Sequence, residues 1–589
     1  MKKIIALLLC LLMTLPLFVA CQGGGKEGEE DKGPTIPVYL GTEIANFDPA
    51  YANLDEAALQ VLGLIYEGLF KYDEDGDVVK AQAKSIKVLD DADDDYYAIE
   101  ITLKNTSWSD GTQVQAADYI YAWKRILETE FRGEAASMLL GIKNARAVNS
   151  GDMSIDDLGV TDVEVDVIRI EFEGPTDYDK FYEYLASPML VPLREIAVDK
   201  VTKDWSSNTA ILVSNGPFVV RTYLPGEKMV LERNIYYLRD VEEDSISKYV
   251  APYRLVVNFK KDITENFADL EAGALVYSDN LPLDQRAAYL SADKVELLDT
   301  MSMLSCLFNT KVAPFDKAEV RTALSLALDR NEIAKILTFA KPAEGLIADG
   351  VYNTGYGKKA TFFREAAGES LIAATANESE AKSLLSKAGV SGGEITLTLR
   401  NNEADVAVAE YIKGVWEELG FTVTLDAQSF KKYEDKIKEY DLVSDPYLEK
   451  YEAGDFGVIL VDWQMLSTDA FPNLAMFAKA FAGGKMDMNV TDDNYELATH
   501  ISGYYKEAYD AKIEAAFAAT DADERARLLH EAEEMLLADM PIAPLVQLRK
   551  GVVVTDDLSE IDTAYFGFYL FKDAELGNRE KYEETVAAK

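Results

Sequence analysis

The side chains that most often carry out catalysis or bind metals are scarce in this chain of 589 residues. It has only two histidines, His500 and His530, and three cysteines. Histidine is the usual proton carrier near neutral pH and the commonest metal ligand, so a histidine-built centre is not expected. The chain also lacks a Gly-x-Ser-x-Gly nucleophile elbow. We therefore expect no enzyme activity, no catalytic residue, no resident metal and no cofactor.

Cys21 is the residue whose chemistry is clearest. Cys21 is preceded by two lysines near the N-terminus, an apolar run and the small residue Ala20. Such an order is typical of a bacterial export signal, and a cysteine directly after the cleavage point resembles a lipobox, whose sulfur is acylated. An uncleaved membrane helix is the alternative, but about 17 apolar residues are at the lower limit for spanning. We expect removal of residues 1–20 and lipidation of Cys21, with stable anchoring by more than one acyl chain.

The charge balance limits the partners of the chain. It has 103 acidic and 59 basic residues, and its formal net charge is −44. Such an excess of negative charge argues against binding to nucleic acid and to anionic lipid headgroups. Contact with the membrane is therefore expected through the lipid anchor only. The anchor would hold the protein on the outer face of the cell membrane, which is extracellular in a single-membrane bacterium and periplasmic otherwise.

Short apolar strands alternate with amphipathic helices from Pro37 onward, which predicts a mixed α/β fold. The predicted strands are 97–103, 165–172, 228–231, 395–399 and 457–461, and the predicted helices are 116–128, 318–337, 378–387, 406–419 and 524–537. Asp75-Gly76, between Phe70 and Val78, predicts a β-hairpin. Two acidic segments, 90–95 and 431–455, are interpreted as exposed loops or insertions.

A series of short motifs follows in order along most of the chain. They are LGLIYEGL at 62–69, WSDGT at 108–112, NGPF at 215–218, VRTALSLALDR at 320–330, AKSLLSKAG at 381–389, Trp463 and PIAP at 541–544. Each motif is weak alone. Together, in this order and at this spacing, they resemble the oligopeptide/dipeptide-binding proteins, solute-binding protein family 5, of ABC importers.

The resemblance implies a periplasmic-binding-protein-like α/β fold with a large two-lobed, three-domain (type II) architecture that closes about a hinge. The implied domains are the signal 1–20, a flexible tether 21–36, lobe I at 37–80, 196–300 and 536–589, lobe II at 81–195 and lobe III at 301–535. The hinge strands would lie near Ser302–Asn309 and Ala543–Val553. A monomer would capture an oligopeptide between lobes I and III and deliver it to the membrane subunits of an ABC permease.

The ligand-binding residues also follow from the resemblance. They are Tyr66, Glu67 and Gly68 in lobe I, and Asp462, Trp463, Gln464, Met465 and Asp469 in lobe III. The usual family pattern in the second segment is Gly-Trp-x-Ala-Asp-Tyr-x-Asp-Pro, in which the first Asp grips the peptide α-amine. Leu466 occupies that position here, and an unpaired buried ammonium costs several kcal/mol. Either Asp462 or Asp469 substitutes, or the ligand is not a free-amine peptide.

Strand geometry separates these two carboxylates. Asp462 should alternate with Trp463 across the strand, so the two side chains cannot face the same cleft. Trp463 is the better candidate to face the ligand, because an indole covers apolar side chains while its N–H finds a partner. Asp469 is therefore predicted to read the positive end of the ligand. A receptor of the same fold for another small solute, and a sensing receptor without a transport role, remain alternatives.

Overall fold

The structure is a computed structural model. It describes residues 32–41, 44–73, 75–128, 134–199, 202–209, 211–239, 243–259, 263–434, 441–465, 467–482 and 500–586. Cys21, the predicted signal 1–20 and Leu466 lie outside the described residues. The chain from Pro34 onward is one unit, separate from residues 1–33. Among the described residues, none of the helices has the length and apolar character that a membrane span requires.

The largest sheet has eleven strands in the described part of the chain. The order of ten of them is β17-β16-β20-β12-β21-β11-β1-β10-β9-β8, and β13 pairs with β21. Their bounds are β1 Thr35–Tyr39, β8 Phe218–Leu224, β9 Lys228–Arg233, β10 Arg254–Asn258, β11 Tyr277–Ser278, β12 Glu296–Phe308, β13 Ala340–Pro342, β16 Gly393–Arg400, β17 Phe421–Gln428, β20 Val458–Gln464 and β21 Ile542–Val554. Strands from distant parts of the sequence therefore meet in one sheet.

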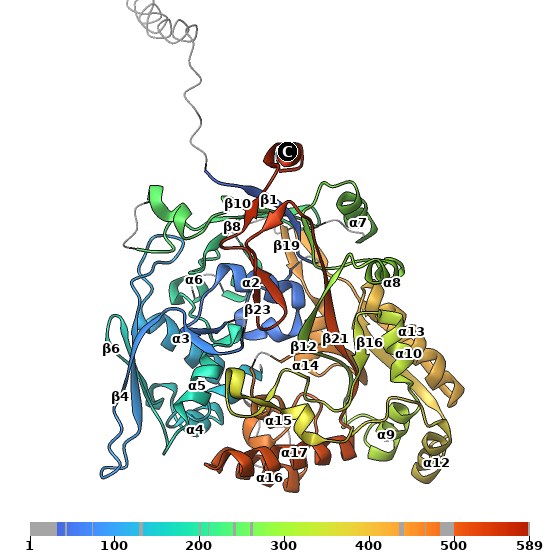
Figure 1. Ribbon diagram of the computed structural model, residues 1–589. Coiled ribbons are helices and arrows are strands. Elements are labelled where there is room, and N and C mark those ends of the chain that lie inside the picture. Colours follow the sequence, from blue (N-terminus) through green and yellow to red (C-terminus); the bar gives the residue numbers. More distant parts are fainter. Residues whose placement is uncertain are drawn as a thin grey trace, which may run out of the picture. The chain divides into compact units, whose positions relative to one another are not determined.

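The two longest strands, β12 and β21, run antiparallel side by side (Figure 1). Residues 300–308 of β12 and 542–547 of β21 are buried, as continuous apolar stretches in a sheet interior predict. The pairing register breaks between Asp299 and Met303. On one side β12 pairs with β20, and on the other β21 pairs with β11. The segments predicted to contain the hinges, Ser302–Asn309 and Ala543–Val553, lie largely within these two strands.

A second, four-stranded sheet comes from residues 83–171. Its order is β4-β5-β7-β6, with bounds Ala83–Val88, Ala98–Leu103, Val167–Glu171 and Val160–Glu164. The hairpin predicted at Asp75-Gly76 is confirmed as β2 (Phe70–Tyr72) paired with β3 (Val78–Lys80). Gly76 has a φ of 78°, which a residue without a β-carbon adopts at little cost.

The predicted helices are present with small shifts at their ends. They are α3 Ala116–Leu127, α12 Glu378–Ala388, α13 Glu403–Glu418 and α17 Ala522–Asp539. The single helix predicted over 318–337 is wrong, because the structure has α9 Ala318–Leu326 and α10 Arg330–Leu337. Asp329 lies between them and accepts hydrogen bonds from the N–H groups of Asn331 and Glu332. A side chain that caps a helix in this way starts a new one.

The interpretation of 431–455 as an exposed loop is wrong for the residues that the structure describes, and the alternative, an insertion, stays a prediction. This segment contains β18 Lys431–Glu434, β19 Asp441–Ser444 and α14 Pro446–Ala453. Tyr447 and Tyr451 of α14 are both buried. The acidic composition concealed these apolar anchors, because carboxylates and tyrosines alternate over the helix. The acidic segment 90–95 is exposed, as predicted.

Candidate functional site

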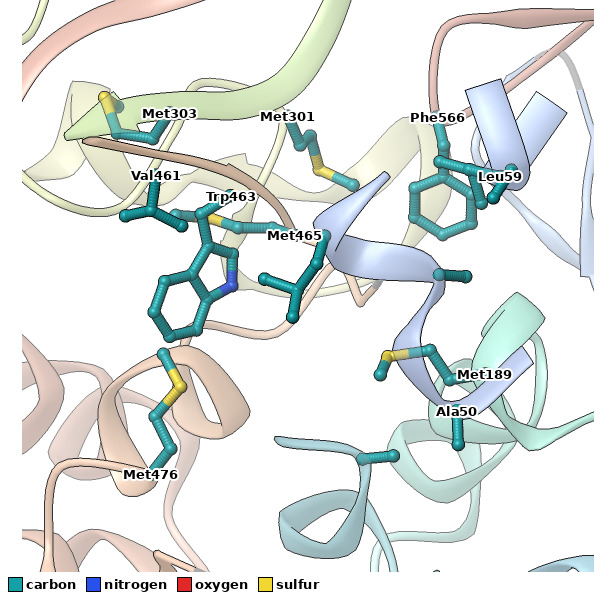
Figure 2. Packing of buried hydrophobic residues seen from close by; sticks show 14 of the residues in the cluster. Ala50, Leu59, Met189, Met301, Met303, Val461, Trp463, Met465, Met476 and Phe566 are labelled. Atoms are coloured by element: carbon teal, nitrogen blue, oxygen red, sulfur yellow. The ribbon is translucent and has the colours of Figure 1, made fainter. Parts of the chain in front are cut away.

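Trp463, in β20, is the centre of an apolar cluster. Its side chain is buried, and its ring stacks on Phe477 and His500 at centroid distances of 6.1 and 6.3 Å. Figure 2 shows four methionine side chains around the indole, Met301, Met303, Met465 and Met476. Methionine is flexible and polarisable, so a methionine-lined surface can adapt to different apolar groups.

The short 3-10 helix η1 (Pro49–Leu54) lies against β20. It leads into α2 (Glu56–Ile65), whose N-terminus is capped by Asp55 through a 3.0 Å hydrogen bond from the N–H of Ala58. In Figure 2 the ribbon of this segment passes close to Met465 and Met301. An N-terminal segment and a strand from the C-terminal half therefore face each other at Trp463.

Asp462 alternates with Trp463, as the strand geometry predicts. It lies opposite Leu304 in the sheet, whereas Trp463 lies opposite Met303. The hydroxyl of Ser302 donates a hydrogen bond to its carboxylate. Burial, together with the neighbouring carboxylates of Glu56 and Asp405, raises the pKa of Asp462 to about 7. Arg400 lowers the pKa of Asp462 but does not cancel these effects, so this carboxylate has too little positive charge around it.

Two cations join the segment that starts α2 to the C-terminal strands near Asp462. Arg400 donates to Asp445 at 2.8 Å and to the carbonyl oxygen of Leu54 at 3.1 Å. Lys550 of β21 pairs with Asp279 at 3.2 Å and with Glu56 at 3.3 Å. The Lys550 and Asp279 side chains are only 4% and 3% exposed, and burial raises the pKa of Asp279 to about 6.

Asp469 has a different environment. Its carboxylate accepts a bidentate pair of hydrogen bonds from Arg525, at 2.9 and 2.5 Å, and another from the hydroxyl of Tyr184. Burial alone would raise the pKa of Asp469, but Arg525 and Lys180 bring it well below its usual value. It also caps α15 (Ala470–Ala475) through the N–H of Phe471. In this structure both of its oxygens are occupied by protein groups.

The structure places Tyr66, Glu67 and Gly68 directly after α2. The Tyr66 hydroxyl donates to the carbonyl oxygen of Val213 at 3.2 Å. The Glu67 main chain exchanges hydrogen bonds with the side chain of Asn215, at 3.1 and 2.8 Å. These contacts stay within the N-terminal part of the chain, whereas η1 is the segment next to β20.

Gln464 and Met465 close the strand segment. Gln464 is buried, and within the described residues its Nε2 has no hydrogen-bond partner. The Met465 sulfur accepts from the N–H of Ala348 at 3.4 Å, and its own N–H donates to the carbonyl oxygen of Met301 at 2.8 Å. Leu466 follows immediately but lies outside the described residues. Where the chain is described, no cluster of three His, Cys, Asp or Glu side chains is placed to hold a metal ion.

Several residues of this region were missed by sequence reasoning. They are Arg400, Lys550, Asp279, Glu56, Tyr184 and Arg525. Their partners lie far away in the sequence, so local spacing carried no signal for them. A basic residue inside a buried apolar strand, such as Lys550, is the one clue that could have been used, because a buried lysine requires a carboxylate partner.

The chain is similar to known proteins over most of its length. Residues 77–485 match the middle region of the bacterial extracellular solute-binding proteins, family 5. The dipeptide-binding protein DppE of Bacillus subtilis is 27% identical over 541 residues, which cover 89% of this chain and 90% of that protein. The oligopeptide-binding protein OppA of Bacillus subtilis is 26% identical and covers 98% of this chain and 99% of its own length.

A solved structure shares the fold. The substrate-binding domain of an oligopeptide ABC transporter from Bacillus anthracis superimposes with a TM-score of 0.76 at 22% identity. The alignment covers 92% of this chain and 99% of the other. The α/β, periplasmic-binding-protein-like architecture predicted from the sequence is thereby confirmed.

Proposed function

Because this chain belongs to family 5 of the bacterial extracellular solute-binding proteins, we propose that it captures oligopeptides outside the cytoplasm and delivers them to an ABC-type permease. The observation that carries the proposal is the strand β20 with Trp463 and its methionines, which faces η1 from the N-terminal half. The similarity over nearly the whole chain to relatives named for dipeptide and oligopeptide binding supports it. Such a receptor binds and releases its ligand and needs no catalytic group.

The peptide lies along Asp462–Met465 in this proposal. Main-chain hydrogen bonds supply affinity without a choice of side chain, and alternate side chains enter pockets on either side. The methionines around Trp463 suit peptides of differing sequence, because their side chains can repack around different groups. The backbone of Tyr66, Glu67 and Gly68, directly after α2, contacts the peptide from the N-terminal side in this proposal, together with η1.

Asp462 binds the positive end of the ligand in this proposal. Its side chain lies on the opposite face of β20 from Trp463, so a peptide running along the strand would place its ammonium on the Asp462 face and apolar side chains on the Trp463 face. Asp469, our first choice from the sequence, already has both oxygens paired with Arg525 and Tyr184. Asp462 has a raised pKa and carboxylate neighbours, so a ligand ammonium would relieve an unfavourable charge. This assignment supplies a carboxylate for the ligand amine in a chain that has leucine at position 466, where the family carries the amine-binding carboxylate.

The hinge lies in β12 and β21. These strands connect the part of the sheet that contains β11 and β1 with the part that contains β20 and β16. The register break between Asp299 and Met303 provides a place where the paired strands can bend. A ligand that contacts both sides only when they are closed would shift the population toward the closed form.

The protein is anchored through a lipid on Cys21. The anchor keeps the receptor close to its permease at high local concentration, and a second acyl chain makes the attachment stable. Cys21→Ser should release the protein from the membrane fraction. The mass of the N-terminal peptide of the mature wild-type protein should include the acyl chains, and an unmodified N-terminus in the membrane fraction would exclude this anchor.

Calorimetry with a peptide library of mixed length tests the proposed function. We expect saturable binding by the wild type and at least about tenfold weaker binding of free-amine peptides by Asp462→Asn, equivalent to about 1.4 kcal/mol. The Asp156→Asn variant, whose side chain is 86% exposed beside Lys124, is the matched control. Binding of sugars or metal chelates in place of peptides, or small non-peptide molecules released on denaturation, would support a receptor for another solute instead.

A further inference from the structure

A cavity of about 280 Å³ is lined by Met303 and Gln547 and extends away from the Trp463 cluster to residues 341–349 and 370–374. It is enclosed by β13, by the segment Ala343–Asp349 and by residues 370–374, with Arg364 at its wall. Its volume is just under the range of about 300–1,000 Å³ that holds drug-sized ligands. A smaller molecule would fit.

Arg364 is the most informative residue of this cavity. It is 7% exposed, and its Nη2 pairs with the fully buried Glu533. Its Nε and Nη2 also donate to the carbonyl oxygen of Ile347 at 3.3 and 3.2 Å. Among the described residues, Nη1 has no hydrogen-bond acceptor. A buried donor left unsatisfied is costly, which points to an acceptor that comes from outside the chain.

The backbone is shaped around this guanidinium. A β-carbon at Gly345 would lie 2.5 Å from Cζ of Arg364, so only glycine allows the guanidinium to lie flat against the chain there. Glu533 accepts from the N–H groups of Leu346 and Ile347 at 2.8 and 2.9 Å and fixes the same segment. The position of Arg364 is therefore built into the fold before any ligand arrives.

The other polar groups of the cavity favour an acceptor as well. Lys341 pairs with one carboxylate oxygen of Asp349. Its ammonium group carries three N–H donors, more than this one oxygen engages. Gln547 is already used, since its Oε1 accepts from the N–H of Asp349 at 2.9 Å and its Nε2 donates to the carbonyl oxygen of Thr300 at 2.9 Å. The remaining carboxylate, Glu344, is exposed to solvent, which screens its charge.

We propose that this cavity binds a small carboxylate beside the peptide site at β20, with which it shares Met303. The carboxylate accepts from Arg364 and Lys341, and a short apolar body contacts Met303, Ile347 and Ile372. Charge-assisted hydrogen bonds of this kind are about twice as strong as neutral ones, so the neutral amide of the same molecule should bind more weakly.

Isovalerate and phenylacetate, with isovaleramide and phenylacetamide as neutral counterparts, are the probes. Calorimetry should show saturable 1:1 binding of an acid at about millimolar Kd or better, and at least about tenfold weaker binding of its amide. Lys341→Met should weaken the binding of the acid about tenfold. Ala374→Phe should fill the cavity and abolish binding. Lys335→Met, at an exposed lysine paired with Glu332, should leave binding unchanged.

The choice of variants at the rim of the cavity protects the test against misfolding. Arg364→Gln removes the charge beside buried Glu533 and can unfold the protein, whereas Lys341→Met and Ala374→Phe change the rim and leave that pair intact. Peptide binding at β20 should persist in both rim variants, which separates this proposal from the proposed function. Absence of acid binding, equal binding of acid and amide, or undiminished binding by Ala374→Phe would overturn the proposal.

Discussion

Asp462 and Asp469 lie seven residues apart in the sequence, one before Trp463 and one after the end of its strand. The structure nevertheless shifts the pKa values of the two carboxylates in opposite directions. Asp469 is paired with Arg525 and Tyr184, and its pKa falls well below the usual value. Asp462 receives one hydrogen bond from Ser302, has carboxylates as neighbours, and its pKa rises to about 7. The difference shows that the availability of a carboxylate to a ligand depends on its partners rather than on its place in a motif.

The largest effect should come from breaking the pair of Asp469. Asp469→Asn keeps a residue that can cap α15 but leaves the Arg525 guanidinium, whose side chain is 20% exposed, without its carboxylate. Breaking a buried pair by removing one partner costs about 3–5 kcal/mol. Chemical denaturation should show a loss of that order in the free energy of unfolding. A variant of unchanged stability whose peptide affinity falls a hundredfold would instead make Asp469 the ligand carboxylate.

Asp462→Asn should act in the opposite direction on stability. The pKa of Asp462 is about 7 in the folded protein and about 3.9 in an unfolded chain. The folded state therefore holds the proton more tightly, and the contribution of Asp462 to stability falls as pH rises from about 4 to about 7. We expect Asp462→Asn to raise the free energy of unfolding by about 2–4 kcal/mol at pH 8 and little at pH 4. Parallel denaturation curves at both pH values check this, and an equal effect at both would contradict it.

Tyr184→Phe should weaken the Asp469 cluster without destroying it. The variant removes the hydroxyl that donates to Asp469 and leaves the bidentate pair with Arg525 in place. Hydrogen bonds to charged groups contribute about 1.5–3 kcal/mol, so the loss of stability should lie in that range. The same variant should not change the pH dependence that we assign to Asp462. Thermal or chemical unfolding of Tyr184→Phe at pH 5 and pH 8 measures both.

The smallest effect concerns the pH dependence of ligand affinity. A ligand ammonium favours the ionised form of Asp462, so the affinity for free-amine peptides should rise as pH increases from about 5 to about 7, below the pKa of about 7.7–8.0 at which a peptide α-amine loses its own proton. The rise should not exceed about tenfold per pH unit for one titrating group. Calorimetry in buffers of different ionisation enthalpy should show release of protons on binding. Proton uptake, or an affinity that falls over this interval, would count against Asp462.

Much of the fold was predictable from the sequence because its signals are local. The hairpin at Asp75-Gly76 and the helices α3 and α13 depend on turn residues and apolar periodicity within a few positions. The split between α9 and α10 was missed, since the pattern of apolar residues continues through Asp329 and only its capping hydrogen bonds reveal the break.

The site was predictable in part. The sequence placed Trp463 in a strand and Asp462 on its other face, because alternation along a strand is a local property. It could not show that Asp469 is paired, since Arg525 is 56 residues and Tyr184 is 285 residues away in the sequence. The burial that raises the pKa of Asp462 likewise depends on segments, such as that of Glu56, which only the fold brings near.

One calorimetric comparison tests the central claim most directly. A free-amine peptide and its N-acetylated form are titrated into the wild type, Asp462→Asn and Asp469→Asn at about pH 7, where most of the peptide α-amine is protonated. Our account predicts that acetylation weakens binding at least about tenfold in the wild type and in Asp469→Asn, and has no effect in Asp462→Asn. Equal binding of the free and acetylated peptides by the wild type would contradict the claim that Asp462 reads the positive end of the ligand.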